Sequence, residues 1–208
     1  MVKPRFSLLL LLFVGSIMAA YYWSQPSLPE QADYYPVGRD INPFTLTDGD
    51  GEPFTAANLA GHWTFLFIGY TYCPDVCPTA LADLRSIYPD LKKIEPSSQV
   101  VFISADPQRD DSARLKSYPA FFHPELKAAT GTPRAPFPPV RNLGLVHSIV
   151  ESERKDYLID HSASIVLINP EGKLVAMFRP KVAPGEVAHV DMQTMVSDFA
   201  RIVRLAAE

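Results

Sequence analysis

The sequence predicts an α/β domain in which a mixed sheet is flanked by helices. Two continuous apolar runs, TFLFIGY at 64–70 and QVVFISAD at 99–106, are typical of strands that are buried on both faces. A segment of helical period follows each run, and the second half of the chain adds a hairpin and a final helix. This order of strands and helices is the one that a layered α/β domain requires.

The first half of the predicted domain contains a hairpin and two helices. FTLTDGDGEPFT at 44–55 indicates a hairpin that turns at Asp48–Gly51. Leucine and isoleucine then recur at helical spacing over 81–91, where Pro89 is expected to kink or divide the helix. Ser112–Phe122 is a shorter helical candidate that carries a proline of its own.

The second half begins with the segment that is hardest to assign. Lys127–Pro139 (KAATGTPRAPFPP) contains four prolines, which favour a mobile or extended loop over a regular element. LGLVHSIV at 143–150 predicts a strand, and SIVLINPEGKLVAMF at 164–178 predicts a hairpin that turns at its Pro-Glu-Gly. Val187–Val203 is expected to close the chain as an amphipathic helix.

An uncharged run precedes the domain. Lys3 and Arg5 stand before Ser7–Trp23 (SLLLLLFVGSIMAAYYW), which is either a cleaved signal peptide or a retained membrane anchor. Cleavage after Ala20 would place Met18 at the −3 position, and cleavage after Ala19 would place Ile17 there. Signal peptidase prefers a small residue at this position. The two tyrosines and the tryptophan that end the run form an interfacial belt. We therefore favour a transmembrane anchor, with the basic N-terminus in the cytoplasm and the domain on the other side.

Three parts of the chain follow from this interpretation: an anchor or signal at 1–23, a linker at 24–38 and one folded domain at 39–208. The linker assignment rests on a polar composition with three prolines and no periodicity. The formal net charge of −4 provides no basic surface for nucleic acid, so no nucleic-acid partner is expected.

TYCPDVCP at 71–78 holds both cysteines of the chain, and it is compatible with a disulfide, a redox catalyst or half of a metal site. Because residues before proline avoid the α region, neither Cys73 nor Cys77 is expected inside a helix. Cys77 is the expected N-cap of the following helix, and Pro74 begins a turn that folds Cys73 back. Amide groups and the helix dipole at this position stabilise a thiolate, which both exchange chemistry and metal binding need.

A metal at two thiolates is expected to be Cu(I), or zinc if four ligands converge. Five histidines are candidates for a further ligand. His161 lies in YLIDHSASIVLI, where a polar stretch gives way to a hydrophobic strand. A position at the edge of that strand, beside the first strand, could direct its imidazole toward the cysteine loop. The other four have ordinary structural interpretations as a turn residue, a helix-end residue, a packed strand residue and a solvent-facing residue, namely His62, His123, His147 and His189.

Three stretches together resemble the SCO/SenC family. They are FTLTDGDG…NLAGHWTFLFIGYTYCPDVCPTAL, ISADPQRD and YLIDHSASIVLINPEGK, and the resemblance covers most of residues 40–178. It implies a thioredoxin-like fold and a copper ion, as Cu(I) and/or Cu(II), bound by Cys73, Cys77 and His161. Asp106–Asp110 (DPQRD) is also typical of the family, but we assign it no ligand role. Asp160 is a candidate partner of His161, with an ordinary surface position as the alternative.

The resemblance also implies a function. It predicts a membrane-anchored copper metallochaperone that assists metallation of the binuclear copper centre of cytochrome c oxidase subunit II. The implied location is a bacterial inner membrane, with a single pass and the soluble domain in the periplasm. Other copper chaperones or thiol reductases are further candidate partners. The region between the short helix and His161 is proline-rich and departs from the family, whose members usually carry a more regular helix and strand there.

Other functions use the same two thiols. The main alternative is a thiol–disulfide oxidoreductase that reduces the cysteines of the oxidase subunit, with Cys73 and Cys77 as the redox-active pair. A thiol peroxidase shares the fold, but a second cysteine so close to the first favours metal or exchange chemistry. A purely structural disulfide is disfavoured by the accessible loop and by His161. The histidine discriminates among these functions, because exchange chemistry does not need it and a three-coordinate copper site does.

Overall fold

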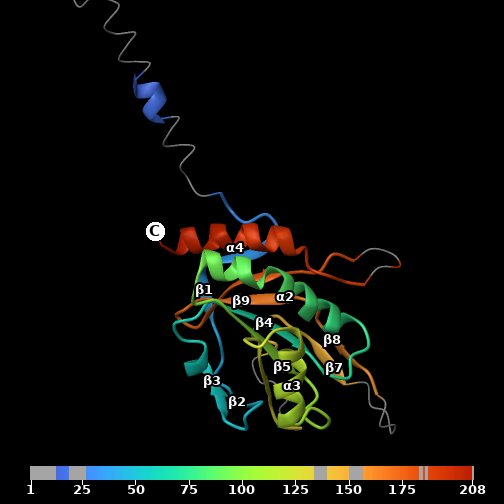
Figure 1. Cartoon of the computed structure of the whole chain (residues 1–208). Helices are drawn as coiled ribbons and strands as arrows, with labels where there is room; N and C mark the ends of the chain where they lie inside the picture. The colour runs from blue at the N-terminus through green and yellow to red at the C-terminus, as the bar shows by residue number, and fades with distance from the viewer. Residues whose placement is uncertain are drawn as a thin grey trace, which may run out of the picture.

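The computed structural model describes residues 13–18, 27–133, 140–149, 157–182, 185 and 187–207. An eight-stranded mixed sheet with the strand order β1-β10-β9-β4-β5-β6-β2-β3 forms the body of the domain (Figure 1). A separate two-stranded sheet of β7 and β8 lies at its side.

The central strands are parallel on one side and antiparallel on the other. β4 (Thr64–Gly69) runs parallel to β5 (Gln99–Ser104), and β5 runs parallel to β6 (Lys127–Thr130). On its other edge β4 pairs antiparallel with β9 (Ile165–Ile168). Every residue of β4 and β5 is buried, as the two apolar runs predicted. The expected α/β domain with a mixed sheet is confirmed.

A hairpin lies on each side of the central strands. β9 turns into β10 (Lys173–Phe178), and β2 (Thr45–Asp48) turns into β3 (Pro53–Thr55), so both predicted hairpins are present. A short 3-10 helix, η1 (Ala56–Asn58), follows β3, and Thr55 and Asn58 form a capping box at its start.

Two segments expected to be irregular form strands. β1 (Ala32–Asp40) pairs antiparallel with β10, so the expected linker at 24–38 is structured from Ala32 onward. β6 occupies the first four residues of the proline-rich stretch, because β5 offers them a parallel partner. Residues 134–139 of that stretch lie outside the described residues.

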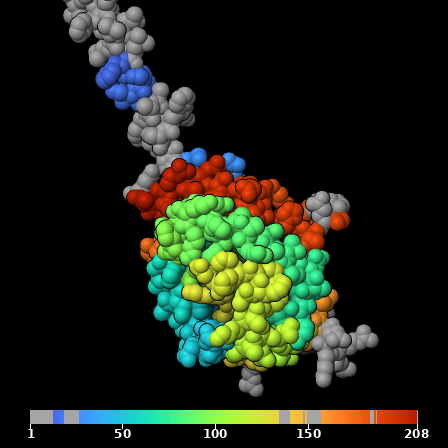
Figure 2. Space-filling view, viewed as in Figure 1, coloured from blue at the N-terminus to red at the C-terminus, as the bar shows by residue number. Residues whose placement is uncertain are grey.

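Three helices cover one face of the sheet: α2 (Val76–Ile94), α3 (Ser112–Phe122) and α4 (Met192–Ala206). Phe65 on β4 packs edge-on against Phe199 of α4, and Phe102 on β5 packs against Tyr118 of α3. Phe65 aligns with Val100 across the ladder, so Phe65 and Phe102 lie on the same face. The space-filling view shows α4, α2 and α3 in succession over that face (Figure 2).

The helix boundaries correct three expectations. α2 continues through Pro89, so of the expected kink or division the division does not occur. The same helix begins at Val76, so Cys77 lies in its first turn and Asp75 is the N-cap. Pro78 is compatible with this start because the first four N–H groups of a helix have no partner within it. The last helix begins at Met192, five residues later than expected, because His189 forms a bridge with Lys181.

The small sheet carries the second polar motif. β7 (His147–Ile149) pairs antiparallel with β8 (Ile159–His161), and His147 is opposite His161 in the register. Near the N-terminus, residues 13–18 are helical, and within the described parts of the chain no helix is both long and apolar enough to cross a membrane. Most of the expected anchor lies outside the described residues.

Candidate metal centre

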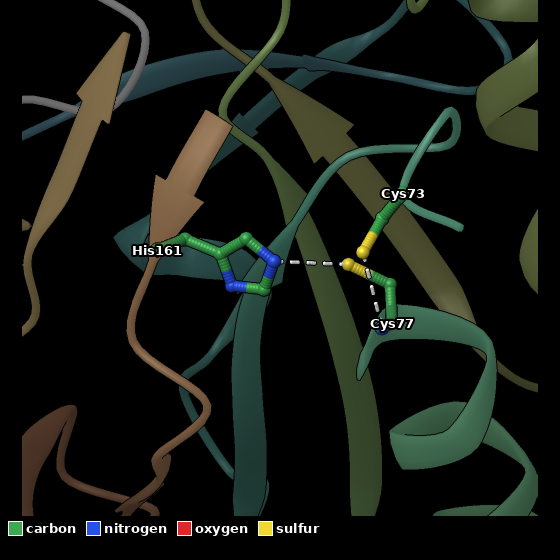
Figure 3. Close-up of side chains that lie close together, drawn as sticks. All are labelled: Cys73, Cys77 and His161. Carbon is green, nitrogen blue, oxygen red and sulfur yellow. Dashed lines mark hydrogen bonds between the residues drawn. The ribbon is translucent and has the colours of Figure 1, made fainter. Parts of the chain in front are cut away.

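Cys73, Cys77 and His161 meet at one end of the sheet. Their ligand atoms, two sulfurs and one imidazole nitrogen, all lie within 4.8 Å of one another. Nε2 of His161 is 3.2 Å from Sγ of Cys77. The close-up shows both sulfurs directed toward the imidazole, with His161 at the end of a strand and Cys77 in the first turn of a helix (Figure 3). Residues that are 84 positions apart in the sequence thus form one cluster.

The loop between β4 and α2 places the two sulfurs. The amide of Cys73 donates to the carbonyl of Tyr70, which closes a turn directly after β4. The amide of Cys77 then donates to Sγ of Cys73 at 3.4 Å, so a free N–H group at the start of α2 contacts a sulfur. The two cysteines are not joined in a disulfide. The fold therefore aligns the first cysteine with the positive end of a helix.

The pKa values of the two cysteines are shifted in opposite directions. Hydrogen bonds from the Cys77 thiol, from His161 and from backbone amides lower the pKa of Cys73 to about 3. Burial, together with the neighbouring Cys73 sulfur, raises the pKa of Cys77 well above its ordinary range. Cys73 is half-buried and Cys77 is fully buried. In the reduced state the outer sulfur is therefore a thiolate and the inner sulfur retains its proton.

Two aromatic rings orient the imidazole of His161. Phe67 and Tyr70 both meet it edge to face, each with ring centroids 5.9 Å apart. Nδ1 of His161 lies 3.3 Å from the carbonyl oxygen of Ser162. Nε2 donates to a cysteine sulfur only while it carries a proton. When the proton lies on Nδ1 instead and faces this carbonyl, Nε2 offers its lone pair to a metal.

A buried carboxylate supports the cysteine loop. Asp110 accepts hydrogen bonds from the amide and the hydroxyl of Thr71, at 3.0 and 2.6 Å, and from the hydroxyl of Ser104 at 2.5 Å. Burial raises the pKa of Asp110, and these hydrogen bonds oppose the rise. Thr71 is two residues before Cys73, so the DPQRD motif acts on the loop through its last aspartate. DPQRD could be recognised as a motif in the sequence, but the contact between Asp110 and Thr71 could not be predicted from it.

Asp160 and three of the other histidines lie outside the cluster. Asp160 is exposed on β8, and alternation along the strand directs it away from the face of His161, so the described contacts do not place it behind the imidazole. His62 hydrogen-bonds the carbonyl of Ser97, and His123 is the C-cap of α3. His189 is exposed, as expected. The side chain of His147 lies outside the described set.

Comparison with known proteins identifies the family. The sequence model described as SCO1/SenC matches residues 35–197. The chain belongs to this family. It is 39% identical over 140 residues to Protein SCO1 homolog 1, mitochondrial, of Arabidopsis thaliana, which covers 65% of this chain and 41% of that protein. It is 31% identical over 169 residues to a putative copper-binding protein of Stutzerimonas stutzeri, which covers 80% of this chain and 83% of the relative.

Solved structures of family members have the same fold. The Arabidopsis thaliana ScoI structure with copper bound matches with a TM-score of 0.67 and 32% identity, and it covers 79% of this chain and 98% of that one. The Bradyrhizobium japonicum ScoI structure with copper bound matches with a TM-score of 0.62 and 31% identity, over 78% and 99% of the two chains. The thioredoxin-like fold expected from the sequence is confirmed.

Proposed function

We propose that this SCO1/SenC family member binds one copper ion through Cys73, Cys77 and His161 and transfers it to a partner protein. The observation that carries the proposal is the convergence of two sulfurs and one imidazole nitrogen within 4.8 Å. Thiolates are soft ligands that suit Cu(I), and the imidazole adds a nitrogen donor that Cu(II) also accepts. Two relatives whose folds match this chain have been solved with copper bound, which supports the same cargo here.

The unequal exposure of the two sulfurs suits transfer. Cys73 is half-buried and already a thiolate, so it is the first sulfur that an arriving copper ion meets. Cys77 is fully buried and must release its proton as the ion settles. On release the order reverses, and a ligand from the partner replaces Cys73 first. The open side of the site is thus the side where cargo is exchanged.

The partner that we propose is cytochrome c oxidase subunit II, whose binuclear copper centre would receive the ion. This step rests on the family resemblance of the TYCPDVCP and DHS stretches. We also propose an anchored protein of a bacterial inner membrane with its domain in the periplasm, based on the apolar run at 7–23. Retention of the chain in the membrane fraction after a high-salt wash tests the anchor, and a soluble form that begins near residue 21 would contradict it.

A second function remains a candidate because of the free dithiol. A half-exposed thiolate beside a buried thiol is the arrangement that attacks a disulfide and then resolves the mixed disulfide. In that function Cys73 attacks a disulfide of the oxidase subunit, and Cys77 closes the bond with Cys73 and releases the reduced subunit. Two electrons pass from this dithiol to the target. An intramolecular Cys73–Cys77 disulfide would also block copper binding.

Metal analysis of the reduced full-length chain tests the copper site. We expect one copper ion per chain after exposure to Cu(I) and removal of excess ion. Cys73→Ser and Cys77→Ser should each abolish tight binding, because each leaves a single soft ligand beside the imidazole. A matched control is Ser164→Ala, a buried polar residue that contributes no ligand atom to the cluster. Full copper occupancy in the double serine variant would refute the proposed site.

A further inference from the structure

Arg109 lies among three tyrosines that belong to the two halves of the candidate metal centre. Its guanidinium carbon is 5.6 Å from the ring centroid of Tyr70 and 5.0 Å from that of Tyr72. It is 3.6 Å from the ring centroid of Tyr157. Tyr70 and Tyr72 flank Thr71 just before Cys73, whereas Tyr157 lies four residues before His161. One cation therefore contacts both the cysteine loop and the segment that carries the histidine.

A buried carboxylate fixes this cation in place. Asp106 is 1% exposed and pairs with Nε of Arg109, whose side chain is 15% exposed. Asp106 also accepts a hydrogen bond from the hydroxyl of Tyr157 at 2.6 Å. The backbone carbonyl of Asp106 accepts from the amides of Arg109 and Asp110, which folds DPQRD into a tight turn. Asp106 and Arg109 thus form a rigid unit that holds Tyr157 by two separate contacts.

The segment that carries the histidine, Tyr157–His161, needs a connection to the main domain. In the described parts of the chain β8 pairs with β7 alone, in a two-stranded sheet that is separate from the main sheet. The hydrogen bonds between Ser162 and Val146, one donated by each backbone amide, join the residues next to these two strands and do not reach the main sheet. The described contacts that join β8 to the main domain are the Phe67 and Tyr70 rings and the Cys77 sulfur around His161, the burial of Ile159, and the contacts of Tyr157. A two-stranded hairpin is only marginally stable by itself in water.

We propose that Arg109 is a positioning residue that holds His161 in line with the two cysteines by joining the two halves of the site. This inference rests on the proposed copper site and adds a role for the DPQRD motif. Arginine suits the position because its planar guanidinium stacks on rings and still hydrogen-bonds a carboxylate, which a lysine ammonium cannot do in the same geometry. Loss of Arg109 should leave both cysteines in place and release the histidine.

Hydrogen exchange of the reduced, metal-free protein tests the inference without copper. In Arg109→Ala the amides of Ile159 and His161 should exchange about tenfold faster, because cation–ring contacts and a charge-assisted bond no longer hold the segment. Arg109→Lys should behave nearly as Arg109→Ala, since it keeps the charge and loses the stacking. Tyr157→Leu removes the same contact from the other side and should reproduce the effect.

Arg114 provides the matched control. Its guanidinium carbon is 4.1 Å from the Tyr72 ring centroid and its Nε donates to the Thr71 hydroxyl, both on the cysteine loop. Arg114→Ala therefore removes a similar cation without touching the histidine half. The amides of Ile159 and His161 should exchange at the wild-type rate in that variant.

Copper affinity supplies a second measurement through a double-mutant cycle. Arg109→Ala should weaken copper binding about tenfold in the wild-type background and should have almost no further effect in His161→Ala. In the Cu(II) form, Arg109→Ala should also lose the nitrogen coupling in the electron paramagnetic resonance spectrum. A residue that only stabilised the fold would weaken binding equally in both backgrounds.

The outcomes separate this inference from the proposed function. Unchanged exchange at Ile159 and His161 in both Arg109→Ala and Tyr157→Leu would overturn the inference, even if copper binds as proposed. An equal loss of affinity with and without His161 would overturn it as well. Failure of the wild-type chain to bind copper would instead refute the proposed function, and the exchange rates would still decide whether Arg109 holds the histidine segment.

Discussion

A Cβ atom at Gly69 would lie 2.6 Å from Sγ of Cys77. The same atom would be 2.8 Å from the ring of Phe102, so the sulfur occupies the space that a side chain on β4 would need. Gly69 is the last residue of β4, and Cys77 lies in the first turn of α2. The glycine therefore determines how closely the inner sulfur approaches the sheet, and with it the distance between Cys77 and His161.

Gly69→Ala should displace the Cys77 sulfur and weaken copper binding. Overpacking a buried position typically costs about 1–3 kcal/mol, and we expect a loss of this size in the free energy of unfolding. The shift of Cys77 should reduce copper affinity by at least about tenfold, because three ligands must meet one ion. Urea unfolding and competitive copper titration measure the two effects.

Gly61→Ala is the control for this prediction. Gly61 has φ +76°, and apart from its two neighbours in the chain no described residue has a heavy atom within 4 Å of the place that a Cβ would take, so alanine is strained there without a clash. It should lower stability by about 1–2 kcal/mol and leave copper affinity unchanged. If Gly69→Ala bound copper as tightly as the wild type, the close packing of Cys77 on β4 would not govern the site.

The reactivity of Cys73 should depend only weakly on pH. Its pKa of about 3 keeps it a thiolate, so alkylation by iodoacetamide should proceed at a nearly constant rate from about pH 5 to about pH 8. A free cysteine would instead slow about tenfold for each pH unit below its pKa of ~8.5. Mass spectrometry of the modified peptide distinguishes Cys73 from buried Cys77. An inflection near the free-cysteine value would contradict the prediction.

The same thiolate should make the stability of the reduced protein rise with pH. The pKa of Cys73 falls from an ordinary 9.0 to about 3 on folding, so its contribution is complete above 9.0 and is lost as the pH falls toward 3. Burial raises the pKa of Cys77, which favours unfolding only at alkaline pH, where the unfolded thiol ionises. Urea titrations between these limits should show a positive slope that Cys73→Ser reduces. An equal slope in that variant would contradict the assignment.

The buried carboxylate of Asp198 should contribute strongly to the free energy of unfolding. This fully buried carboxylate accepts from the backbone amides of Glu30, Gln31 and Ala32 at 2.7, 2.8 and 3.0 Å, which ties the start of β1 to α4. Asp198→Ala removes the acceptor of these three backbone donors and of the Arg201 guanidinium, and it should cost about 2–4 kcal/mol. Copper stoichiometry should not change.

Asp33→Ala is the comparison for Asp198, because Asp33 also lies near the start of β1 and forms an exposed ion pair with Arg179. Exposed pairs contribute about 0–1 kcal/mol, so this variant should be close to the wild type in urea unfolding. Equal destabilisation by the two substitutions would show that the buried carboxylate does not hold the N-terminal segment.

The sequence was sufficient for the buried strands and insufficient for the strands at the edge of the sheet. The apolar runs of β4 and β5 identify them without any partner. β1 is half exposed, contains Pro36 and Gly38, and has a register shift between Tyr34 and Arg39, so it lacks a regular alternation. Its partner, β10, lies some 140 residues further along the chain. Strand formation there depends on tertiary pairing, which local pattern does not encode.

The residues of the candidate site also fall into those that the sequence could predict and those that it could not. Cys73, Cys77 and His161 could be proposed from residue type, motif and resemblance, and the fold brings them together. Gly69 and Arg109 could not be proposed from the sequence, because their roles depend on residues that only the fold brings near them. Gly69 leaves room for the Cys77 sulfur, and Arg109 lies between Tyr72 and Tyr157. DPQRD was visible as a motif, yet its contacts reach residues about 40 and 50 positions away.

His161→Ala separates copper transfer from thiol exchange. The variant keeps both sulfurs, so it should still form and exchange a Cys73–Cys77 disulfide. Because His161 also helps to lower the pKa of Cys73, a modest change in the exchange rate is expected. Copper affinity should fall sharply, since Cu(I) loses its nitrogen ligand and Cu(II), which prefers nitrogen and oxygen donors, loses more.

The cellular result of the same substitution decides between the two functions. If copper transfer is the function, cells with His161→Ala should fail to load the oxidase centre although the dithiol remains active. If reduction of the subunit's cysteines is the function, loading should continue, and only Cys73→Ser or Cys77→Ser should stop it. Ser164→Ala, which leaves the ligand atoms intact, controls for expression of a variant chain. Normal oxidase assembly with His161→Ala would remove the need for a three-ligand copper site and favour the oxidoreductase.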